Sequence, residues 1–171
     1  MTLSNAQVGA TIKGDYSSAL DLTTALASLT VTRGAAFDNG TGAGQADKIF
    51  SDTRTLGISA SEDLDLAGVL LDAFGAAITF ARVKGLMIAA SPSNTNNVLV
   101  GGVTNGFVGF LTPAATGIIT LRPGSFLCVG CGSADATGFV VTPATGDLLH
   151  VANSGAGTSV TYDVVVIGSS V

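Results

Sequence analysis

From about residue 78 onward, the sequence is a series of short β-branched segments separated by turn residues, and this pattern constrains the fold most. Val, Ile, Thr, Ala and Phe fill the segments. Pro, Gly and Asn occupy the breaks, where Pro fixes φ and Gly or Asn tolerates a positive φ. Such spacing is expected of an all-β sandwich or barrel. The expected strands are 77–90, 97–102, 106–111, 117–122, 125–130, 138–142, 146–153 and 159–168.

The N-terminal part of the sequence follows a different pattern. Residues 19–34, ALDLTTALASLTVTRG, fit a short helix or a strand, and their Thr-rich second half favours a strand. The glycine-rich run at 37–45 is expected to form a flexible loop. Residues 61–75 begin with polar and apolar residues in alternation, which predicts a strand, and their continuation is compatible with one helical turn. We therefore expect an N-terminal extended arm at 1–45 and a β-sandwich at 46–171.

The chain is unusually poor in charge. Charged residues make up 11% of it, against roughly 25% in an ordinary soluble domain. Beyond residue 85 the only charged residues are Arg122, Asp135, Asp147 and Asp163, joined by the single histidine, His150. Charges keep protein surfaces apart in solution, so we expect this half to be solvated by Ser, Thr, Asn and Gly and partly buried in an assembly.

Composition also excludes several classes of partner. The net charge is −5 and no basic cluster is present, which argues against nucleic acid. No apolar run approaches the ~20 residues that span a bilayer, and the first residues lack the pattern of a signal peptide. We therefore expect a soluble protein made in a reducing cytoplasm, without membrane or nucleic-acid partners. In that compartment two cysteines do not indicate a disulfide scaffold.

Both cysteines lie in one C-x-x-C spacing, Cys128 and Cys131, which can indicate a dithiol redox centre or half of a zinc site. The preceding Arg122–Ser125 (RPGS) fits a type II turn between two apolar strands, so we expect a β-hairpin here. Side chains three apart on a strand point to opposite faces, so the two sulfurs are not expected to meet. A zinc site also needs two more ligands, which His150 alone does not supply. We predict two ordinary free thiols.

His150 is the one histidine available to a Ser-His-Asp triad, and no G-x-S-x-G nucleophile motif accompanies it. Strand parity places it opposite Leu149 and Val151, so we expect a histidine on a strand surface. The glycine-rich stretch 39–45 contains G-T-G-A-G rather than G-x-G-x-x-G and lacks a βαβ context. A hinge is therefore expected there, not a phosphate-binding loop.

The acidic cluster of the chain consists of Glu62, Asp63 and Asp65, with Asp72 nearby. A carboxylate pair for glycoside hydrolysis and a calcium site both stay open, although the D-x-[DN]-x-[DN]-G spacing is missing. The alternation favours a plain strand, with Asp63 and Asp65 in solvent and Leu64 and Leu66 in the core. We predict no catalytic, cofactor-binding or metal-binding residues and no enzymatic activity.

Four runs carry a resemblance to a known family: LDLAGVLLDAFGAAITFARVKGLMIAA, LRPGSFL, ATGDLLHVANSG and TYDVVVIGSS. They resemble the jelly-roll head decoration (cement) proteins of tailed bacteriophages, over roughly residues 46–171. The resemblance implies a jelly-roll β-sandwich that binds the major capsid protein on the exterior of the phage head as a homotrimer. It implies a non-enzymatic virion protein that stabilises the capsid lattice and is synthesised in the bacterial host cytoplasm.

A second class of function stays open, a virion-surface module on head or tail that binds a glycan or a host receptor, because jelly rolls serve both roles. Sugar sites usually carry an exposed aromatic side chain. The eight phenylalanines are expected in the core, which leaves only Tyr16 and Tyr162 and favours the structural role. An enzyme with an unusual active site is the third class. The Thr-rich segment 11–32 is expected to add an edge strand to a neighbour.

Overall fold

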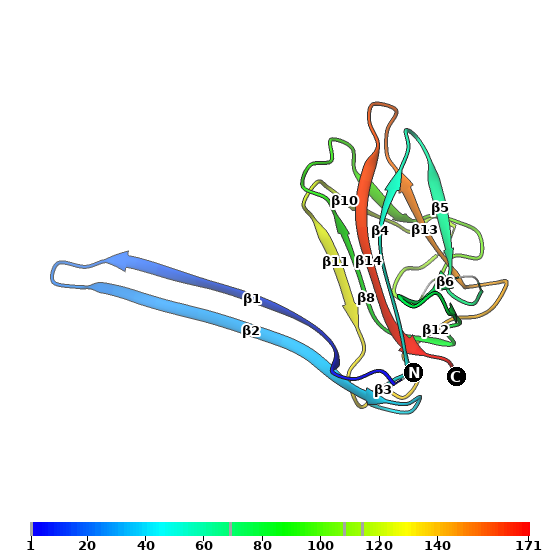
Figure 1. The fold of residues 1–171 in the computed structure, drawn as a ribbon. Coiled ribbons are helices and arrows are strands. Elements are labelled where there is room, and N and C mark those ends of the chain that lie inside the picture. The colour runs from blue at the N-terminus through cyan, green and yellow to red at the C-terminus, as the bar shows by residue number, and fades with distance from the viewer. Residues whose placement is uncertain (1, 69, 108, 114) are drawn as a thin grey trace.

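The computed structural model of the chain describes residues 2–171 apart from 69, 108 and 114. These residues form an all-β fold, as the sequence predicts, in which two sheets pack together and an N-terminal arm extends away from them (Figure 1). The strands, in chain order, are β1 (Ala6–Ala19), β2 (Thr24–Asn39), β3 (Gln45–Ala46), β4 (Lys48–Leu56), β5 (Ser61–Asp65), β6 (Leu70–Leu71), β7 (Ala77–Ile78), β8 (Arg82–Ala90), β9 (Val98–Gly101), β10 (Ile118–Leu121), β11 (Phe126–Gly130), β12 (Phe139–Val140), β13 (Leu148–Asn153) and β14 (Val160–Ser169).

The body of the protein has the strand order of a jelly roll. The arm-side sheet runs β11-β8-β14-β4, with the short β12 also paired to β8, and the distal sheet runs β10-β9-β13-β5. Among these eight strands the first pairs with the last (β4 with β14) and the second with the seventh (β5 with β13). The third pairs with the sixth (β8 with β11) and the fourth with the fifth (β9 with β10). This nested pairing rolls eight strands into two facing sheets, which is the jelly-roll β-sandwich.

Side chains that point from one sheet toward the other form the core. On β14, alternate residues such as Val160, Tyr162 and Val164 are buried, whereas Asp163 points outward and is exposed. The same alternation on β5 buries Leu64, as the sequence predicts. Burial on one side of each strand explains the period of two in the apolar residues.

The turn at Arg122–Ser125 forms as predicted, but it does not close a hairpin. Gly124 has a φ of +77°, and the Ser125 amide donates a hydrogen bond of 2.8 Å to the Arg122 carbonyl. The strand before the turn, β10, pairs with β9, whereas the strand after it, β11, pairs with β8 in the other sheet. The expected hairpin was wrong because such a turn reverses the chain equally well between two sheets. Leu121 and Leu127 accordingly pack on the core from opposite sheets.

The expected strand at 106–111 is not found in the described part of that segment, where Gly106 makes only an isolated bridge to Leu148. Phe107 and Phe110 instead lie edge to face with ring centroids 5.8 Å apart. These apolar side chains pack on the core without pairing in a sheet. The error has a physical reason. A short apolar run has the same composition whether it pairs as a strand or packs on the core as a loop.

Two further segments differ from the expectation. The strand expected at 77–90 is interrupted at 79–81, so that β7 pairs with β6 and β8 belongs to the arm-side sheet. After β5 the described residues form a turn and the short β6 instead of a helical turn. The phenylalanines are also not all in the core, because Phe74 and Phe126 are 83% and 66% exposed.

The arm enters the body through β3, which pairs with the end of β2 in parallel. The glycine-rich loop between them is closed by the Gly42 amide, which donates a hydrogen bond of 2.9 Å to Gln45 Oε1. β4 then begins at Lys48 in the arm-side sheet. The division into an arm at 1–45 and a sandwich at 46–171 stays a prediction.

The core assignment makes a testable prediction on two phenylalanines. Phe80 is 1% exposed and Phe74 is 83% exposed. We expect Phe80→Ala to lower the free energy of unfolding by about 3–5 kcal/mol, because it removes buried contacts and leaves a cavity. The control Phe74→Ala is expected to change it by less than about 0.5 kcal/mol. Urea denaturation followed by circular dichroism measures both, and equal effects would contradict the assignment.

Candidate interaction arm

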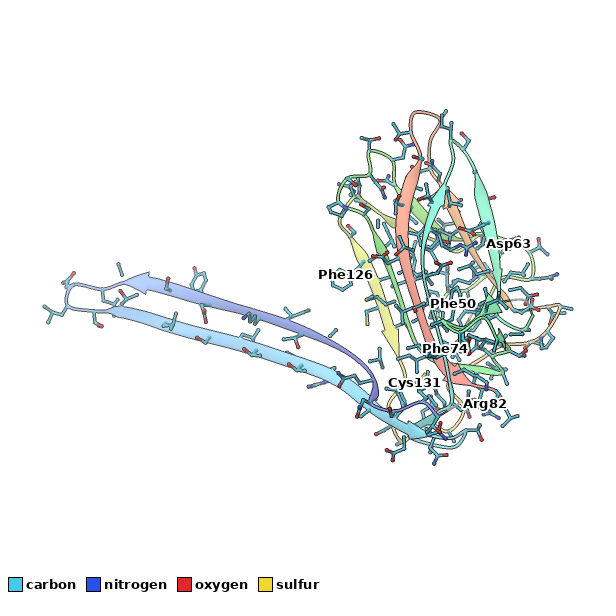
Figure 2. The ribbon with its side chains drawn as sticks, in the orientation of Figure 1. Phe50, Asp63, Phe74, Arg82, Phe126 and Cys131 are labelled. Atoms are coloured by element: carbon cyan, nitrogen blue, oxygen red, sulfur yellow. The ribbon has the colours of Figure 1, made fainter. Side chains whose placement is uncertain are left out.

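The arm is a two-stranded antiparallel hairpin of β1 and β2 that stands clear of the body. Its strands pair without interruption from Ala6 opposite Phe37 to Ala19 opposite Thr24. β1 has 14 residues, so at about 3.3 Å per residue the arm is about 45 Å long. Figure 2 shows the side chains of the arm projecting freely, whereas those of the body crowd together. The segment expected to add to a neighbouring sheet thus pairs with itself, and its addition to a neighbour stays a prediction.

The arm has two faces of different chemistry, because residues directly opposite in an antiparallel pair share a face. The apolar face consists of Ala6, Val8, Ala10, Ile12, Gly14, Tyr16 and Ser18 with Phe37, Ala35, Arg33, Val31, Leu29, Ala27 and Ala25. The polar face consists of Gln7, Gly9, Thr11, Lys13, Asp15, Ser17 and Ala19 with Ala36, Gly34, Thr32, Thr30, Ser28, Leu26 and Thr24. Arg33 is the one charged residue on the apolar face, and Leu26 is the one leucine on the polar face.

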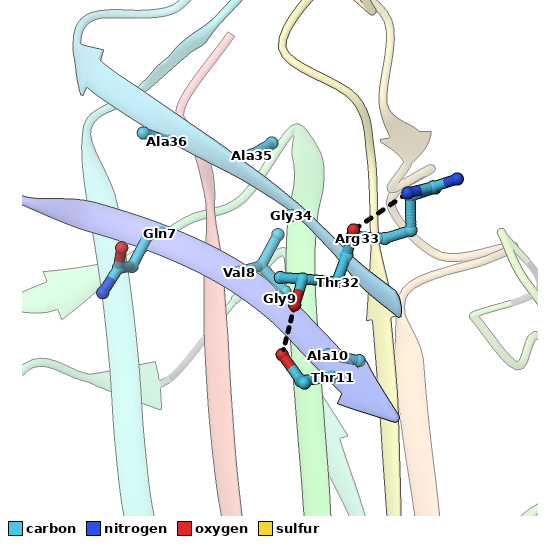
Figure 3. Close-up of a pocket in the computed structure, with 10 residues that line it drawn as sticks. All are labelled: Gln7, Val8, Gly9, Ala10, Thr11, Thr32, Arg33, Gly34, Ala35 and Ala36. Carbon is cyan, nitrogen blue, oxygen red and sulfur yellow. Dashed lines mark hydrogen bonds between the residues drawn. The ribbon is translucent and has the colours of Figure 1, made fainter. Parts of the chain in front are cut away.

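At its root the apolar face is buried against the arm-side sheet. Phe37 is 4% exposed and packs with Ile167 of β14. Val8 lies over Gly85 of β8 and Gly130 of β11, where an added Cβ would come within 3.0 Å and 2.7 Å of the valine side chain. Glycine at both positions therefore lets the arm approach the sheet closely. Figure 3 shows the arm at this joint.

Beyond the joint, none of the residues that the structure describes covers this face. Ile12, Tyr16 and Leu29 are 75%, 82% and 61% exposed, and Leu22 at the tip is 99% exposed. The apolar face is thus buried at the root of the arm and exposed toward its tip. Contiguous apolar surface of this kind marks an interaction site.

Apart from its backbone ladder, the hairpin has few side-chain interactions of its own among the described residues. The Thr11 and Thr32 hydroxyls share one hydrogen bond of 2.9 Å across the polar face. Such a cross-strand pair contributes less than about 1 kcal/mol to the stability of a sheet. An isolated two-stranded hairpin is marginally stable at best in water. The exposed apolar face and this low intrinsic stability make the arm the candidate functional site.

A second uncovered apolar surface lies on the outer face of the arm-side sheet. Cys128 stands opposite Met87, Met87 opposite Val165, and Phe126 opposite Ala89. We name these five residues the body patch. Phe126 and Met87 are 66% and 39% exposed. A crevice of about 200 Å³ separates the lower edge of the patch from the root of the arm.

Both predicted thiols are free and contact different elements. Cys128 is half-buried on the outer face, with its sulfur 3.9 Å from the Gly9 carbonyl oxygen of the arm. Cys131 is buried, with its sulfur 3.7 Å from the Val83 carbonyl oxygen, and burial raises the pKa of its thiol. Cys128 thus lies against the arm on the outer face of β11, and Cys131 is buried directly after the end of that strand.

His150 lies on the outer side of the distal sheet, between the buried Leu149 and Val151, as parity predicts. Its Nδ1 is 2.6 Å from Asp63 Oδ1, because β5 and β13 pair with Asp63 directly opposite His150. Sequence reasoning missed this contact, since it depends on which strands are neighbours. The geometry is that of a cross-strand surface pair.

The acidic cluster of the sequence is dispersed in the structure. Leu64 and Leu66 are buried as predicted, but the carboxylates take separate local roles. Asp65 accepts a hydrogen bond of 2.9 Å from the Ala67 amide, and Asp72 accepts two of 2.9 Å in the following turn. Within the described residues, no group of three or more His, Cys, Asp or Glu side chains is placed to hold a metal ion.

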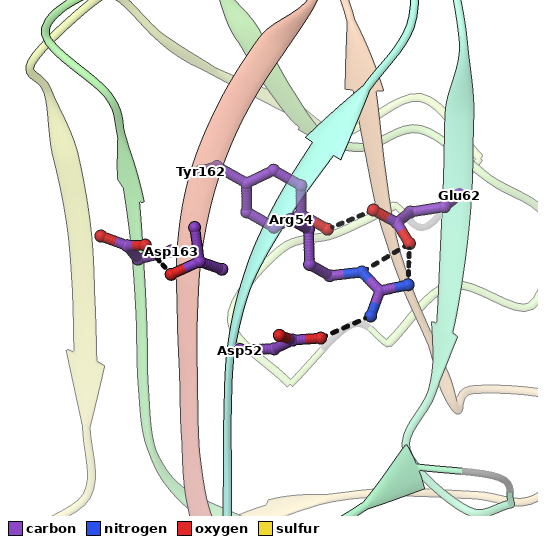
Figure 4. Close-up of polar contacts among 6 residues, drawn as sticks. Asp52, Arg54, Glu62, Tyr162 and Asp163 are labelled. Atoms are coloured by element: carbon purple, nitrogen blue, oxygen red, sulfur yellow. Dashed lines mark hydrogen bonds and ion pairs between the residues drawn. The ribbon is translucent and has the colours of Figure 1, made fainter.

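Glu62 instead joins a polar network at the edge between the sheets (Figure 4). The buried Tyr162 hydroxyl donates to Glu62 Oε1 at 2.8 Å, and Arg54 Nε donates to Glu62 Oε2 at 2.6 Å. Arg54 also donates to Asp52 at 2.7 Å. Burial and the hydrogen bond to Glu62 raise the pKa of Tyr162 well above its ordinary range. The network satisfies a buried phenol and so serves the fold.

Comparison with known protein families, curated proteins and solved structures finds no match to this chain. Among the residues that the structure describes, no helix is long and apolar enough to cross a bilayer. The arm and the body patch therefore supply the observations on which a function is proposed.

The network makes a pH-dependent prediction. The folded protein keeps Tyr162 neutral, whereas the unfolded chain ionises it above a pH of about 10, so stability falls as pH rises past that value. Tyr162→Phe is expected to lower the free energy of unfolding at pH 7 by about 1.5–3 kcal/mol and to weaken this alkaline loss. The exposed Tyr16→Phe is the control and should change neither. Denaturant titrations from pH 7 to 11 measure both, and an unchanged alkaline slope in Tyr162→Phe would contradict the assignment.

Proposed function

We propose that the chain is a non-enzymatic structural protein of a tailed-phage virion, a decoration protein that binds the exterior of the head as a trimer and stabilises the capsid lattice. The observation that carries the proposal is the apolar face of the arm, bare along most of its length on a charge-poor body. An exposed apolar face of this kind marks a site that another subunit or particle covers. The partners are sister copies and the major capsid protein.

The proposed mechanism is attachment by many moderate contacts. A standard interface buries about 800 Å² per partner. A trimer that meets several capsid subunits at once combines such contacts, and each added contact becomes effectively intramolecular. Because the trimer binds the assembled lattice and not the free capsid subunits, its binding stabilises the lattice by mass action.

Three further observations support a structural role over catalysis. The jelly-roll body agrees with the fold implied by the resemblance to head decoration proteins. The run TYDVVVIGSS, one of those that carry the resemblance, contains most of β14, the central strand that contacts both the core and the root of the arm. The conspicuous polar groups, Arg54 with Glu62 and His150 with Asp63, are already engaged with one another.

A virion-surface adhesion module is the second candidate, and one observation favours it. Phe74, Tyr16 and Phe126 are 83%, 82% and 66% exposed, and exposed aromatic rings are the usual platform for a sugar. They come from a turn, the arm and β11, so they do not form one platform. The structural role therefore stays first.

The proposal is tested by adding purified protein to undecorated capsids of its phage. Electron microscopy is expected to reveal density at defined lattice positions, and decorated capsids are expected to resist heating better than bare ones. A variant with residues 10–33 replaced by Asn-Gly keeps the buried root and removes the bare face, so its occupancy should fall about tenfold or more. Unoccupied capsids together with saturable hits on a glycan array would replace the proposal by the adhesion alternative.

A further inference from the structure

One chain carries two uncovered apolar surfaces, the outer part of the apolar face of the arm and the body patch. We propose that the apolar face of each arm docks on the body patch of a second copy of this chain. The inference specifies the subunit contact of the trimer in the proposed function, and it rests on that function only for the number of subunits.

The chain already contains one contact of this kind. At the joint, Val8 of the apolar face lies on Gly85 and Gly130 of the arm-side sheet. Met87 follows Gly85 on β8, and Cys128 precedes Gly130 on β11, each two residues further along the same outer face. The body patch therefore continues the surface on which the arm is seated. Docking from a neighbour extends an established contact rather than creating a new kind.

The charges on the two surfaces are few and opposite. Arg33 is the only charged residue of the apolar face, and its guanidinium donates to the adjacent Thr32 carbonyl. Asp163 stands opposite Ala89 beside the body patch and accepts a hydrogen bond of 2.6 Å from Thr53. Neither surface presents a like charge to the other, so a copy with a net charge of −5 meets no local repulsion there.

The size of the arm favours an assembly in which each subunit both gives and receives an arm. Outside the joint the arm extends about 33 Å over two strands, which gives a face of about 330 Å², less than half of a standard footprint. Arm and patch are unlike surfaces, so their contact is heterologous, and the trimer of the proposed function closes it in a ring. In that ring every subunit gives one arm and receives one, which doubles the contact per subunit.

Docking by the apolar face covers the exposed apolar side chains of the arm, which addition of an edge strand does not. Edge addition satisfies backbone groups of β1 or β2 but leaves Ile12, Tyr16 and Leu29 in water. Docking by the face covers these side chains and the exposed Phe126 in one contact. Burial of this apolar surface stabilises the contact more than backbone hydrogen bonds that only replace hydrogen bonds to water.

The arm is tested with two leucines of β2. Leu29 on the apolar face and Leu26 on the polar face are 61% and 64% exposed. Sedimentation velocity over a range of concentrations is expected to reveal a trimer for the native chain and for Leu26→Ser. Leu29→Ser should weaken association about tenfold or more. A native chain that stays monomeric, or equal effects of the two substitutions, would overturn the proposal.

The receiving surface is tested with two exposed phenylalanines. Phe126→Ser in the body patch should also weaken association, whereas Phe74→Ser, outside the patch, should not. If Phe126→Ser assembles like the native chain, the arms bind one another or an edge strand, and the proposal is wrong. An unchanged circular dichroism spectrum of each variant separates loss of the contact from loss of the fold.

Mixing the two defective variants tests the direction of docking. The intact arm of Phe126→Ser should bind the intact patch of Leu29→Ser, so a 1:1 mixture is expected to associate more tightly than either variant alone. A mixture that associates no more tightly than the separate variants would contradict the contact. No capsid is present, so a trimer that fails to decorate capsids would refute the proposed function and leave this inference standing. A monomer that decorates capsids would overturn this inference together with the trimer, and would leave capsid decoration standing.

Discussion

The contact of Val8 with Gly85 and Gly130 is the constraint on which the rest of the arrangement depends. It seats an apolar hairpin on the outer face of a sheet whose inner face already carries the core. β14 takes part on both sides, with Ile167 in the root of the arm and Val166 in the core. A side chain at either glycine would displace Val8 and open the joint, because no space remains for a Cβ. The arm is therefore positioned by the body and not by its own strands.

The strands and their buried faces were predictable from the sequence, because burial on one side of a strand leaves a local period of two. His150 between Leu149 and Val151 is an example, since parity alone placed it on the surface. The pairing of strands was not predictable in this way. The turn at Arg122–Ser125 has the same local chemistry in a hairpin and between two sheets, and only contacts with β8 and β9 decide between them.

The candidate site was partly predictable. An N-terminal extension was expected, but its hairpin was not, although the signal is present as alternation of Ile12 and Tyr16 with Lys13 and Asp15. That alternation has a counterpart in β2, and the two together define one apolar face. The exposed Phe126 gave no local signal at all, since the outer face of a sheet is identified only when the opposite face is known to be the core.

The length of the arm has a mechanical consequence. About 33 Å of it extends beyond a joint formed by a few side chains, so a rotation of about 10° at the joint displaces the tip by about 6 Å. Two bodies joined by such an arm stay attached at defined surfaces while the distance between them varies. A shell that changes curvature or expands requires such compliance from whatever is fastened to its surface.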